Sequence, residues 1–386
     1  MARWLFLALV FAAADVAAQQ QPADSPAALQ AAVSRLGVFD SAARVEAARI
    51  LRRAPAEVVV PILAAAARNQ GDEYVRYRAL TLLSGFPGPT TASVMAAVRG
   101  DRNDRLRTVA FGWYEHNPDP VALPALIEAF DRETSEFVRP ALTRALAAQA
   151  GDPRARAVLG PLVLKGADFF RGSVIEALGE YGGRFALADL ATVAELEGPL
   201  QDDAITAIGR LGDASQVALL ARLQRTAPQP VQPTLSAALC LLGQACDETD
   251  RYLKDTLAFA STSTGFQALL RGAVHGQGML ALHRRKGALD VLLDAGVAAK
   301  TEAARAPIVL GLGMVALKQP ELVMITLEGR RDLDETIRLF VDGFDMLAED
   351  YEEERFFAAV RRAYWAASEG SARRRVAEAL IVKLEF

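Results

Sequence analysis

Apolar residues recur along this chain at the spacing of an α-helix, within segments that themselves recur about every 31 residues. In residues 75–83 the apolar positions fall at offsets 0, 4, 7 and 8 from Val75, which places them on one face of a helix. The seven equivalent first positions are Ala43, Val75, Leu106, Val138, Phe170, Leu200 and Val231. Their intervals are 32, 31, 32, 32, 30 and 31 residues. The pattern therefore predicts seven amphipathic helices in successive copies of one structural unit.

A second helical segment lies between consecutive helices of this series, so the repeating unit is a helical hairpin. Small residues dominate at offset 4, and glycine often ends the helix, as Gly212 does after Leu211. Small side chains let neighbouring helices approach closely, and glycine accepts the left-handed conformation that ends a helix. We expect an all-α fold, an α-solenoid of about 10–11 helical hairpins wound into a superhelix, in which neighbouring units share one core.

Two segments carry the repeated motif most fully, residues 71–76 (Gly-Asp-Glu-Tyr-Val-Arg) and residues 204–213 (Ala-Ile-Thr-Ala-Ile-Gly-Arg-Leu-Gly-Asp). An acidic turn, Val-Arg at the helix start, small residues along the helix and a Leu-Gly-Asp exit resemble the short HEAT-like repeats, the variety also seen in phycobilisome lyases. The signatures of tetratricopeptide and ankyrin repeats are missing. The resemblance implies a fold rather than an activity.

The repeat is regular over residues 31–245 and irregular beyond them. In residues 246–386 the helices of the main series are expected to begin near Gly265, Ala303, Leu333 and Ser371. We interpret this part as degenerate helical repeats followed by a C-terminal cap, because terminal repeats of a solenoid cover an open core. A separate C-terminal helical domain is the alternative.

The N-terminus has the pattern of a secretory signal peptide. Arg3 precedes an apolar run over residues 4–14, and the small residues 16–18 precede Gln19 as a cleavage site. We expect residues 1–18 to be removed, residues 19–30 to form a flexible segment, and the mature chain to be periplasmic or extracellular. A membrane anchor is the alternative, but Asp15 ends the apolar run short of the roughly 20 residues that a span needs. The mature chain is expected to contain no membrane span.

Composition narrows the class of partner. The formal net charge is −4, from 43 basic and 47 acidic residues. A nucleic-acid-binding protein normally carries a basic excess, so no nucleic-acid partner is expected. The oligomeric state cannot be inferred from the sequence.

Five arginines occupy equivalent positions, one residue after the first position of each unit: Arg44, Arg76, Arg107, Arg139 and Arg171. Such a column could bind an acidic ligand along one edge of the stack. The resemblance instead implies that each arginine pairs with a turn carboxylate or carbonyl, and the nearby acids are Asp72, Asp104, Glu136 and Asp168. We favour this structural role, because charge at a half-buried turn needs a partner.

Other chemistry-bearing residues are few. Cys240 and Cys246 could form a local disulfide after export. His116, His275 and His283 form no metal-binding motif, and we find no nucleophile elbow or phosphate-binding loop. The sequence therefore predicts no cofactor, no metal site and no catalytic residue.

Polar residues at offsets 2 and 6 of the regular helices would face a partner if these helices line a concave surface. The candidate contact residues are Arg49, Tyr77, Thr81, Thr108, Arg144 and Glu176. Their mixed chemistry favours a protein or peptide ligand over a repetitive polymer. We expect an exported scaffold that binds such a partner on its concave face. The alternatives are a structural component of the cell envelope and a lyase-like or other enzyme built on HEAT-like repeats.

Overall fold

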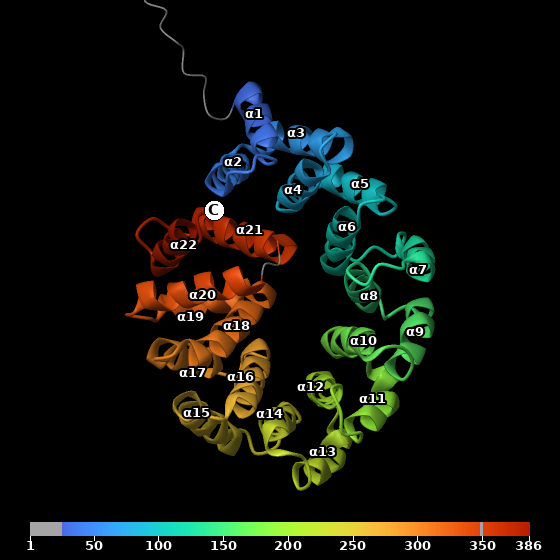
Figure 1. The fold of residues 1–386 in the computed structure, drawn as a ribbon, viewed down its shortest axis with the longest axis vertical. Helices are drawn as coiled ribbons and strands as arrows, with labels where there is room; N and C mark the ends of the chain where they lie inside the picture. Colours follow the sequence, from blue (N-terminus) through green and yellow to red (C-terminus); the bar gives the residue numbers. More distant parts are fainter. Residues whose placement is uncertain (1–24, 348–349) are drawn as a thin grey trace, which may run out of the picture.

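The computed structural model describes residues 25–347 and 350–386, and the expected signal peptide lies outside the described residues. The described residues form 22 α-helices and no β-strand. The helices pair as hairpins that stack side by side, so the molecule is an all-α solenoid (Figure 1).

The helices with even numbers form one continuous series, in which each contacts the next. They are α2 (Ser41–Arg53), α4 (Glu73–Ser84), α6 (Asp104–His116), α8 (Arg139–Ala147), α10 (Asp168–Glu180), α12 (Gln201–Leu211), α14 (Gln232–Leu241), α16 (Gln267–Leu282), α18 (Glu302–Lys318), α20 (Leu333–Leu347) and α22 (Ala372–Lys383). From α2 to α18 this series lines the inside of the curve (Figure 1).

The odd-numbered helices up to α19 lie mainly on the outside of the curve (Figure 1). They are α1 (Pro26–Arg35), α3 (Ala56–Asn69), α5 (Pro89–Val98), α7 (Leu123–Arg132), α9 (Pro153–Leu159), α11 (Leu187–Ala194), α13 (Val217–Gln224), α15 (Cys246–Thr262), α17 (Ala288–Ala298) and α19 (Pro320–Glu328), and α21 (Asp350–Ala366) follows them in the chain. Short 3₁₀ turns at Gly160–Val163, Arg184–Ala186, Ala214–Gln216 and Gln229–Val231 complete the hairpins.

Small residues allow the inner helices to pack closely. A Cβ atom added at Gly209 of α12 would lie 2.8 Å from Cα of Ala238 in α14, and one at Gly179 of α10 would lie 2.7 Å from Cα of Ala207 in α12. Both glycines stand nine residues after the first position of their unit. Close packing of the inner helices on one side of each hairpin contributes to the curvature of the stack.

The expected flexible segment 19–30 extends too far. Residues 26–30 form the first half of α1, and the Ser25 side chain accepts a hydrogen bond from the amide of Ala28. A serine N-cap followed by proline is a strong helix start. Leu29 is fully buried, so this part of the chain belongs to the folded solenoid.

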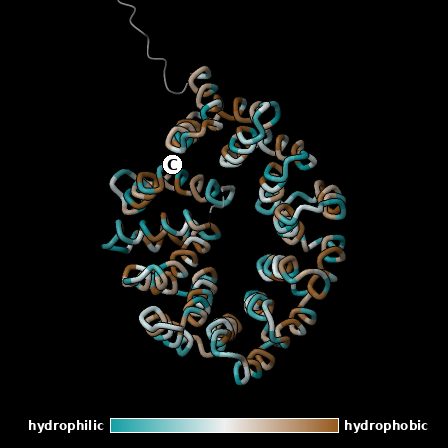
Figure 2. The backbone as a smooth tube through the Cα atoms, in the orientation of Figure 1, coloured by the Kyte–Doolittle hydropathy of each residue, from teal (hydrophilic) through white to brown (hydrophobic). Residues whose placement is uncertain are grey.

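The packing does not break at residue 246. Helix α15 packs on α14 and α16, and one cluster of buried apolar residues continues from Phe111 to Phe386. A second cluster, from Leu29 to Ala110, fills the N-terminal units. Hydrophobic residues recur in the hairpins all around the curve (Figure 2).

The solenoid closes on itself to form a ring (Figure 1). Helix α21 packs against α4, and its Glu354 is fully buried. Oε2 of Glu354 accepts a hydrogen bond of 2.6 Å from Nε of Arg52 in α2, and Arg361 lies 3.4 Å from Oε1. The carbonyl of the last residue, Phe386, accepts a bond of 3.2 Å from Arg53. The inner face of the solenoid is therefore the wall of a closed ring.

Within the described residues, no single helix is long and apolar enough to span a membrane. The adjacent helices α18 and α19 satisfy the length and composition only together, with a bend of 112° between them.

Candidate functional site

The structure disperses the six candidate contact residues along the inner helices. Thr81 is 2% exposed and donates to the carbonyl of Tyr77, so it offers no surface to a partner. Thr108 likewise donates to the carbonyl of Asp104 in its own helix. Hydroxyls at these helical positions bond to the preceding turn of the backbone, which sequence spacing alone does not reveal.

Two other candidates lie on the N-terminal part of the inner face. Arg49 forms an ion pair of 2.5 Å with Glu46 of its own helix. The Tyr77 ring lies beneath the guanidinium of Arg105, 5.6 Å from its centroid. Both side chains are half-buried and remain accessible to solvent.

Arg144 and Glu176 belong to a polar network that spans the interior of the ring. Nε of Arg144 donates to Oε2 of Glu115 at 2.9 Å, and the Tyr181 hydroxyl donates to the other oxygen of Glu115 at 2.7 Å. Glu176 accepts a bond of 3.0 Å from Nζ of Lys318, which also pairs with Glu180. Lys318 is in α18 and Glu176 is in α10, so the ion pair joins the two sides of the ring.

The charge of Lys318 determines the state of Glu176. Desolvation by the surrounding protein would raise the pKa of Glu176, although the carboxylate is accessible from the interior. The charge and hydrogen bond of Lys318 outweigh this effect, with Arg144 helping, and the pKa is lowered to about 2. Glu176 is therefore ionised at neutral pH and matches the charge of Lys318.

Glu115, His116 and Glu352 form the cluster in the described residues with spacing suited to a metal ion. Their ligand atoms all lie within 4.8 Å of one another, and Nε2 of His116 lies 3.0 Å from Oε1 of Glu352. However, Arg144 already pairs with Glu115, and Arg355 pairs with Glu352. The two carboxylates are thus neutralised by two guanidinium groups, and a divalent cation would add uncompensated positive charge. We interpret the cluster as an ionic contact that joins α6 to α21.

The arginines of the column are hydrogen-bonded to other groups of the same chain. Each arginine donates to a backbone carbonyl in the turn or helix that precedes its own helix, and glutamines do the same in the next two units: Arg44 to Val38 and Phe39, Arg76 to Ala67, Arg107 to Asp101, Arg139 to Glu133, Arg171 to Val163, Gln201 to Ala194, and Gln232 to Gln224 and Ala227. Such carbonyls lack partners at a helix end. Glutamine can replace arginine because both donate N–H groups.

The acid partners of the column differ in part from the expected ones. Arg107 and Arg171 do pair with Asp104 and Asp168. The predicted pairing of Arg76 with Asp72 is wrong. Asp72 caps α4 by accepting hydrogen bonds from the amides of Tyr74 and Val75. Arg76 instead forms an ion pair of 2.5 Å with Asp101 of the next unit.

The pairing of Arg139 with Glu136 is also wrong. The Arg139 guanidinium lies over the rings of Phe130 and Phe170, at 5.0 and 4.4 Å from their centroids. Cation–π contact replaces the expected ion pair. The two cysteines at the end of the regular repeats, Cys240 and Cys246, are joined in a disulfide.

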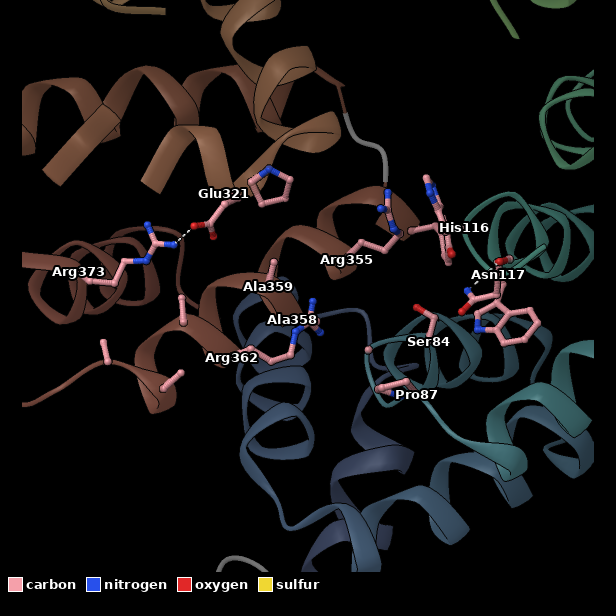
Figure 3. A pocket seen from close by; sticks show the side chains of 17 residues that line it. Ser84, Pro87, His116, Asn117, Glu321, Arg355, Ala358, Ala359, Arg362 and Arg373 are labelled. Atoms are coloured by element: carbon pink, nitrogen blue, oxygen red, sulfur yellow. Dashed lines mark hydrogen bonds and ion pairs between the residues drawn. The ribbon is translucent and has the colours of Figure 1, made fainter. Parts of the chain in front are cut away.

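A pocket of about 820 Å³ lies where the ring closes (Figure 3). Ser84 and Asn117 line one side, and Arg355, Arg362 and Arg373 line the other. Arg373 is paired with Glu321, as the dashed line in Figure 3 shows, and with Glu328. Since Arg355 is paired with Glu352, two of the three arginines are already neutralised.

An apolar groove of about 510 Å³ lies on the inner face, between α16 and α18. Its floor includes Met279, Met314 and Met346, which are three of the six methionines of the chain. Its other apolar residues include Val274, Leu282, Leu310 and Val315, and its polar rim is formed by Glu176, Arg210, Gln267, Arg271, His275 and Lys318. We call this feature the methionine groove. The sequence pattern does not reveal this groove, because the methionines come from three different helices, α16, α18 and α20.

His275 contributes a neutral side chain to the groove. The imidazole is accessible from the groove, yet desolvation by the dense surroundings, together with the charge of Arg210, lowers its pKa to about 4. Its Nε2 lies 2.8 Å from the hydroxyl of Thr206. The groove thus combines an apolar floor, a neutral histidine and a charged rim, which is the usual composition of a ligand-binding surface.

No protein-family model matches the chain, and no curated protein matches it. Among solved structures, it is similar to YibA of Escherichia coli, with 18% identity, 57% of this chain and 83% of that chain covered, and a TM-score of 0.41. For importin beta the identity is 11%, the coverage 93% and 59%, and the TM-score 0.38. For the complex of CpcE and CpcF of phycocyanin lyase from Nostoc the identity is 18%, the coverage 86% and 98%, and the TM-score 0.27.

These likenesses are too weak to carry an argument about activity or partners. The repeated motif and the stacked helical hairpins are features of the chain itself. On these two grounds the chain is an all-α solenoid of helical hairpins, and its repeated motif resembles that of the short HEAT-like repeats.

Proposed function

We propose that the protein is an exported scaffold that binds a protein or peptide partner on the inner face of its ring. The methionine groove is the observation that supports this proposal best. Leu310 and Met314 are each 38% exposed and Met346 is 47% exposed, so apolar side chains face the interior without a covering segment among the described residues. Methionine is flexible and polarisable, and methionine-rich surfaces adapt to apolar side chains of partners.

One of the six residues chosen from the sequence lines the groove, and a second acts on it. Glu176 lies on its rim, and Arg144 acts on Glu176 through its charge. Arg49, Tyr77 and Thr108 lie on the N-terminal part of the same inner series and are retained as a second contact area. In this proposal the apolar groove supplies most of the binding free energy, and the polar residues orient the partner.

A photo-crosslinking amino acid placed at Met314 in native cells tests this function. We expect a covalent adduct with a protein, and we expect it to disappear in a Gly278→Leu variant. Gly278 lines the groove, and a Cβ there would meet only Val315, at 3.8 Å. The first carbon of a larger side chain is therefore accommodated, and we expect the rest of the side chain to extend into the groove. Gly278→Ala leaves most of the space open and is the matched control.

The same crosslinker at Ile325, an exposed position of α19 outside the groove, shows whether an adduct is specific. Equal adducts at Met314 and Ile325, or an adduct at Met314 that persists in Gly278→Leu, would refute inner-face binding. The N-terminal residue of the mature protein tests export separately. Gln19 is expected, and a chain that retains residues 1–18 would count against it.

A further inference from the structure

The methionine groove is elongated. Its lining residues on α16 run from Gln267 to Leu282, and those on α18 run from Ala306 to Lys318. At 1.5 Å per residue the α16 side alone extends about 22 Å. On both helices these residues recur at intervals of three or four, so each helix presents one continuous stripe. A groove of this shape fits a segment of polypeptide better than a single side chain.

The rim of the groove has an excess of positive charge. Arg210, Arg271 and Lys318 face Glu176 as the one carboxylate among the described lining residues. Lys318 is occupied by Glu176 and Glu180. The two arginines are therefore the groups available to an occupant.

Arg210 has unused hydrogen-bonding capacity. Its side chain is only 11% exposed, and its nearest carboxylate oxygen within the described residues, Oε2 of Glu180, lies 3.9 Å away. No described residue accepts a hydrogen bond from this guanidinium, which carries five N–H donors. The nitrogen atoms of Arg210 are not among the buried polar atoms that lack a partner, so its donors are open to solvent in the groove and available to the acceptors of an occupant.

Arg271 is exposed at the other half of the groove, and no described residue forms a hydrogen bond or ion pair with it. Arg271 is on the second turn of α16, whereas Arg210 lies at the end of α12 beside Glu180 and Lys318. The two guanidinium groups that donate no hydrogen bond to a described residue therefore come from different helices.

We propose that the methionine groove binds an amphipathic, acidic segment of a partner protein. Apolar side chains of the segment lie on Met279, Met314 and Met346, and its carboxylates bond to Arg210 and Arg271. This inference rests on the proposed function and specifies the chemistry of the partner. The occupant is a polypeptide because the groove extends along whole helices. It is acidic because Arg210 and Arg271 are the charged groups of the rim that donate no hydrogen bond to a described residue.

Synthetic peptides test the charge requirement on the purified full chain. The first peptide is as long as α16, with leucines at helical spacing and glutamates near both ends; a second has glutamine in place of glutamate. We expect the glutamate peptide to bind at least about tenfold more tightly, because hydrogen bonds between charged groups are about twice as strong as neutral ones. Fluorescence anisotropy at constant ionic strength gives both dissociation constants.

Arg210→Gln and Arg271→Gln are expected to remove most of this difference. Arg338→Gln is the matched control, since Arg338 is exposed on α20, lies outside the groove and has no bonded partner among the described residues. Arg271→Glu provides a second variant at an exposed position, where folding is not at risk. We expect it to weaken the glutamate peptide and to favour a peptide with lysine near its ends.

The possible failures are distinguishable. If the two peptides bind equally and Gly278→Leu weakens both, the groove is a binding site but the acidic specificity is refuted. If Gly278→Leu changes neither affinity, or if neither peptide binds, the proposed occupant is wrong. In either case the crosslink at Met314 still decides whether a protein binds the inner face.

Discussion

Two glycines of the inner helices should respond to the same substitution in opposite ways. Gly278 of α16 and Gly209 of α12 both lie within α-helices, where alanine is favoured over glycine by about 1 kcal/mol. At Gly278 the added Cβ meets only Val315, at an ordinary contact distance of 3.8 Å. We therefore expect Gly278→Ala to increase the free energy of unfolding by about 1 kcal/mol.

At Gly209 the added Cβ would lie 2.8 Å from both Cα and Cβ of Ala238. Neither atom can rotate away, so α12 and α14 must separate. Forcing an extra carbon into a packed core costs about 1–3 kcal/mol, and this rigid contact belongs at the upper end. After the gain in helix propensity is subtracted, Gly209→Ala should lower the free energy of unfolding by about 2 kcal/mol.

Urea unfolding followed by circular dichroism measures both variants, with the slope compared as well as the midpoint. The expected difference between them is about 3 kcal/mol. Gly179→Ala should behave like Gly209→Ala, because its Cβ would lie 2.7 Å from Cα of Ala207. If Gly209→Ala is as stable as Gly278→Ala, the inner helices do not pack as closely as we describe.

Two further predictions concern the closure of the ring. Glu354→Gln leaves Arg52 and Arg361 without their buried carboxylate, so the contact between α21 and α2 should weaken by about 3–5 kcal/mol. Amide hydrogen exchange should become faster in both helices, whereas the exposed control Glu335→Gln should leave it unchanged. Unchanged protection in Glu354→Gln would contradict the role of Glu354. Burial would raise the pKa of Glu352, but the His116 hydrogen bond and the Arg355 charge lower it to about 2 from an ordinary 4.5. Its stabilising contribution is therefore complete above about pH 4.5 and is lost as the pH falls towards 2. Glu352→Gln should be less stable at neutral pH and lose less stability on acidification, and identical pH profiles for the variant and the parent chain would rule this out.

The local sequence pattern was sufficient to predict the α-helices and the stacking of the helical hairpins. The starts of α4, α6, α10, α12 and α14 lie within two residues of the first positions identified in the sequence. In the irregular part, α16, α18, α20 and α22 also begin within two residues of the expected positions. Helical periodicity, N-caps and glycine exits depend on residues near in sequence, which explains this agreement. The contact between neighbouring units is likewise repeated locally, and so the solenoid could be inferred.

The sequence could not show how the stack ends or which side chains meet inside it. Glu354 meets Arg52 across 302 residues, and Glu352 meets His116 across 236. Small rotations between successive units accumulate over the stack, and only their sum decides whether the two ends come together. Once they do, Lys318 of α18 pairs with Glu176 of α10 across the interior, and His116 of α6 meets Glu352 of α21.

The methionine groove likewise depends on how the successive units are arranged in space. Met279, Met314 and Met346 lie in three hairpins of the irregular half, where no repeated position identifies them. The sequence therefore determined the helices, their order and their pairing, because these follow from short-range periodicity and capping. Only the tertiary structure decided the closed ring, the paired charges and the exposed groove, because each depends on contacts between residues far apart in the chain.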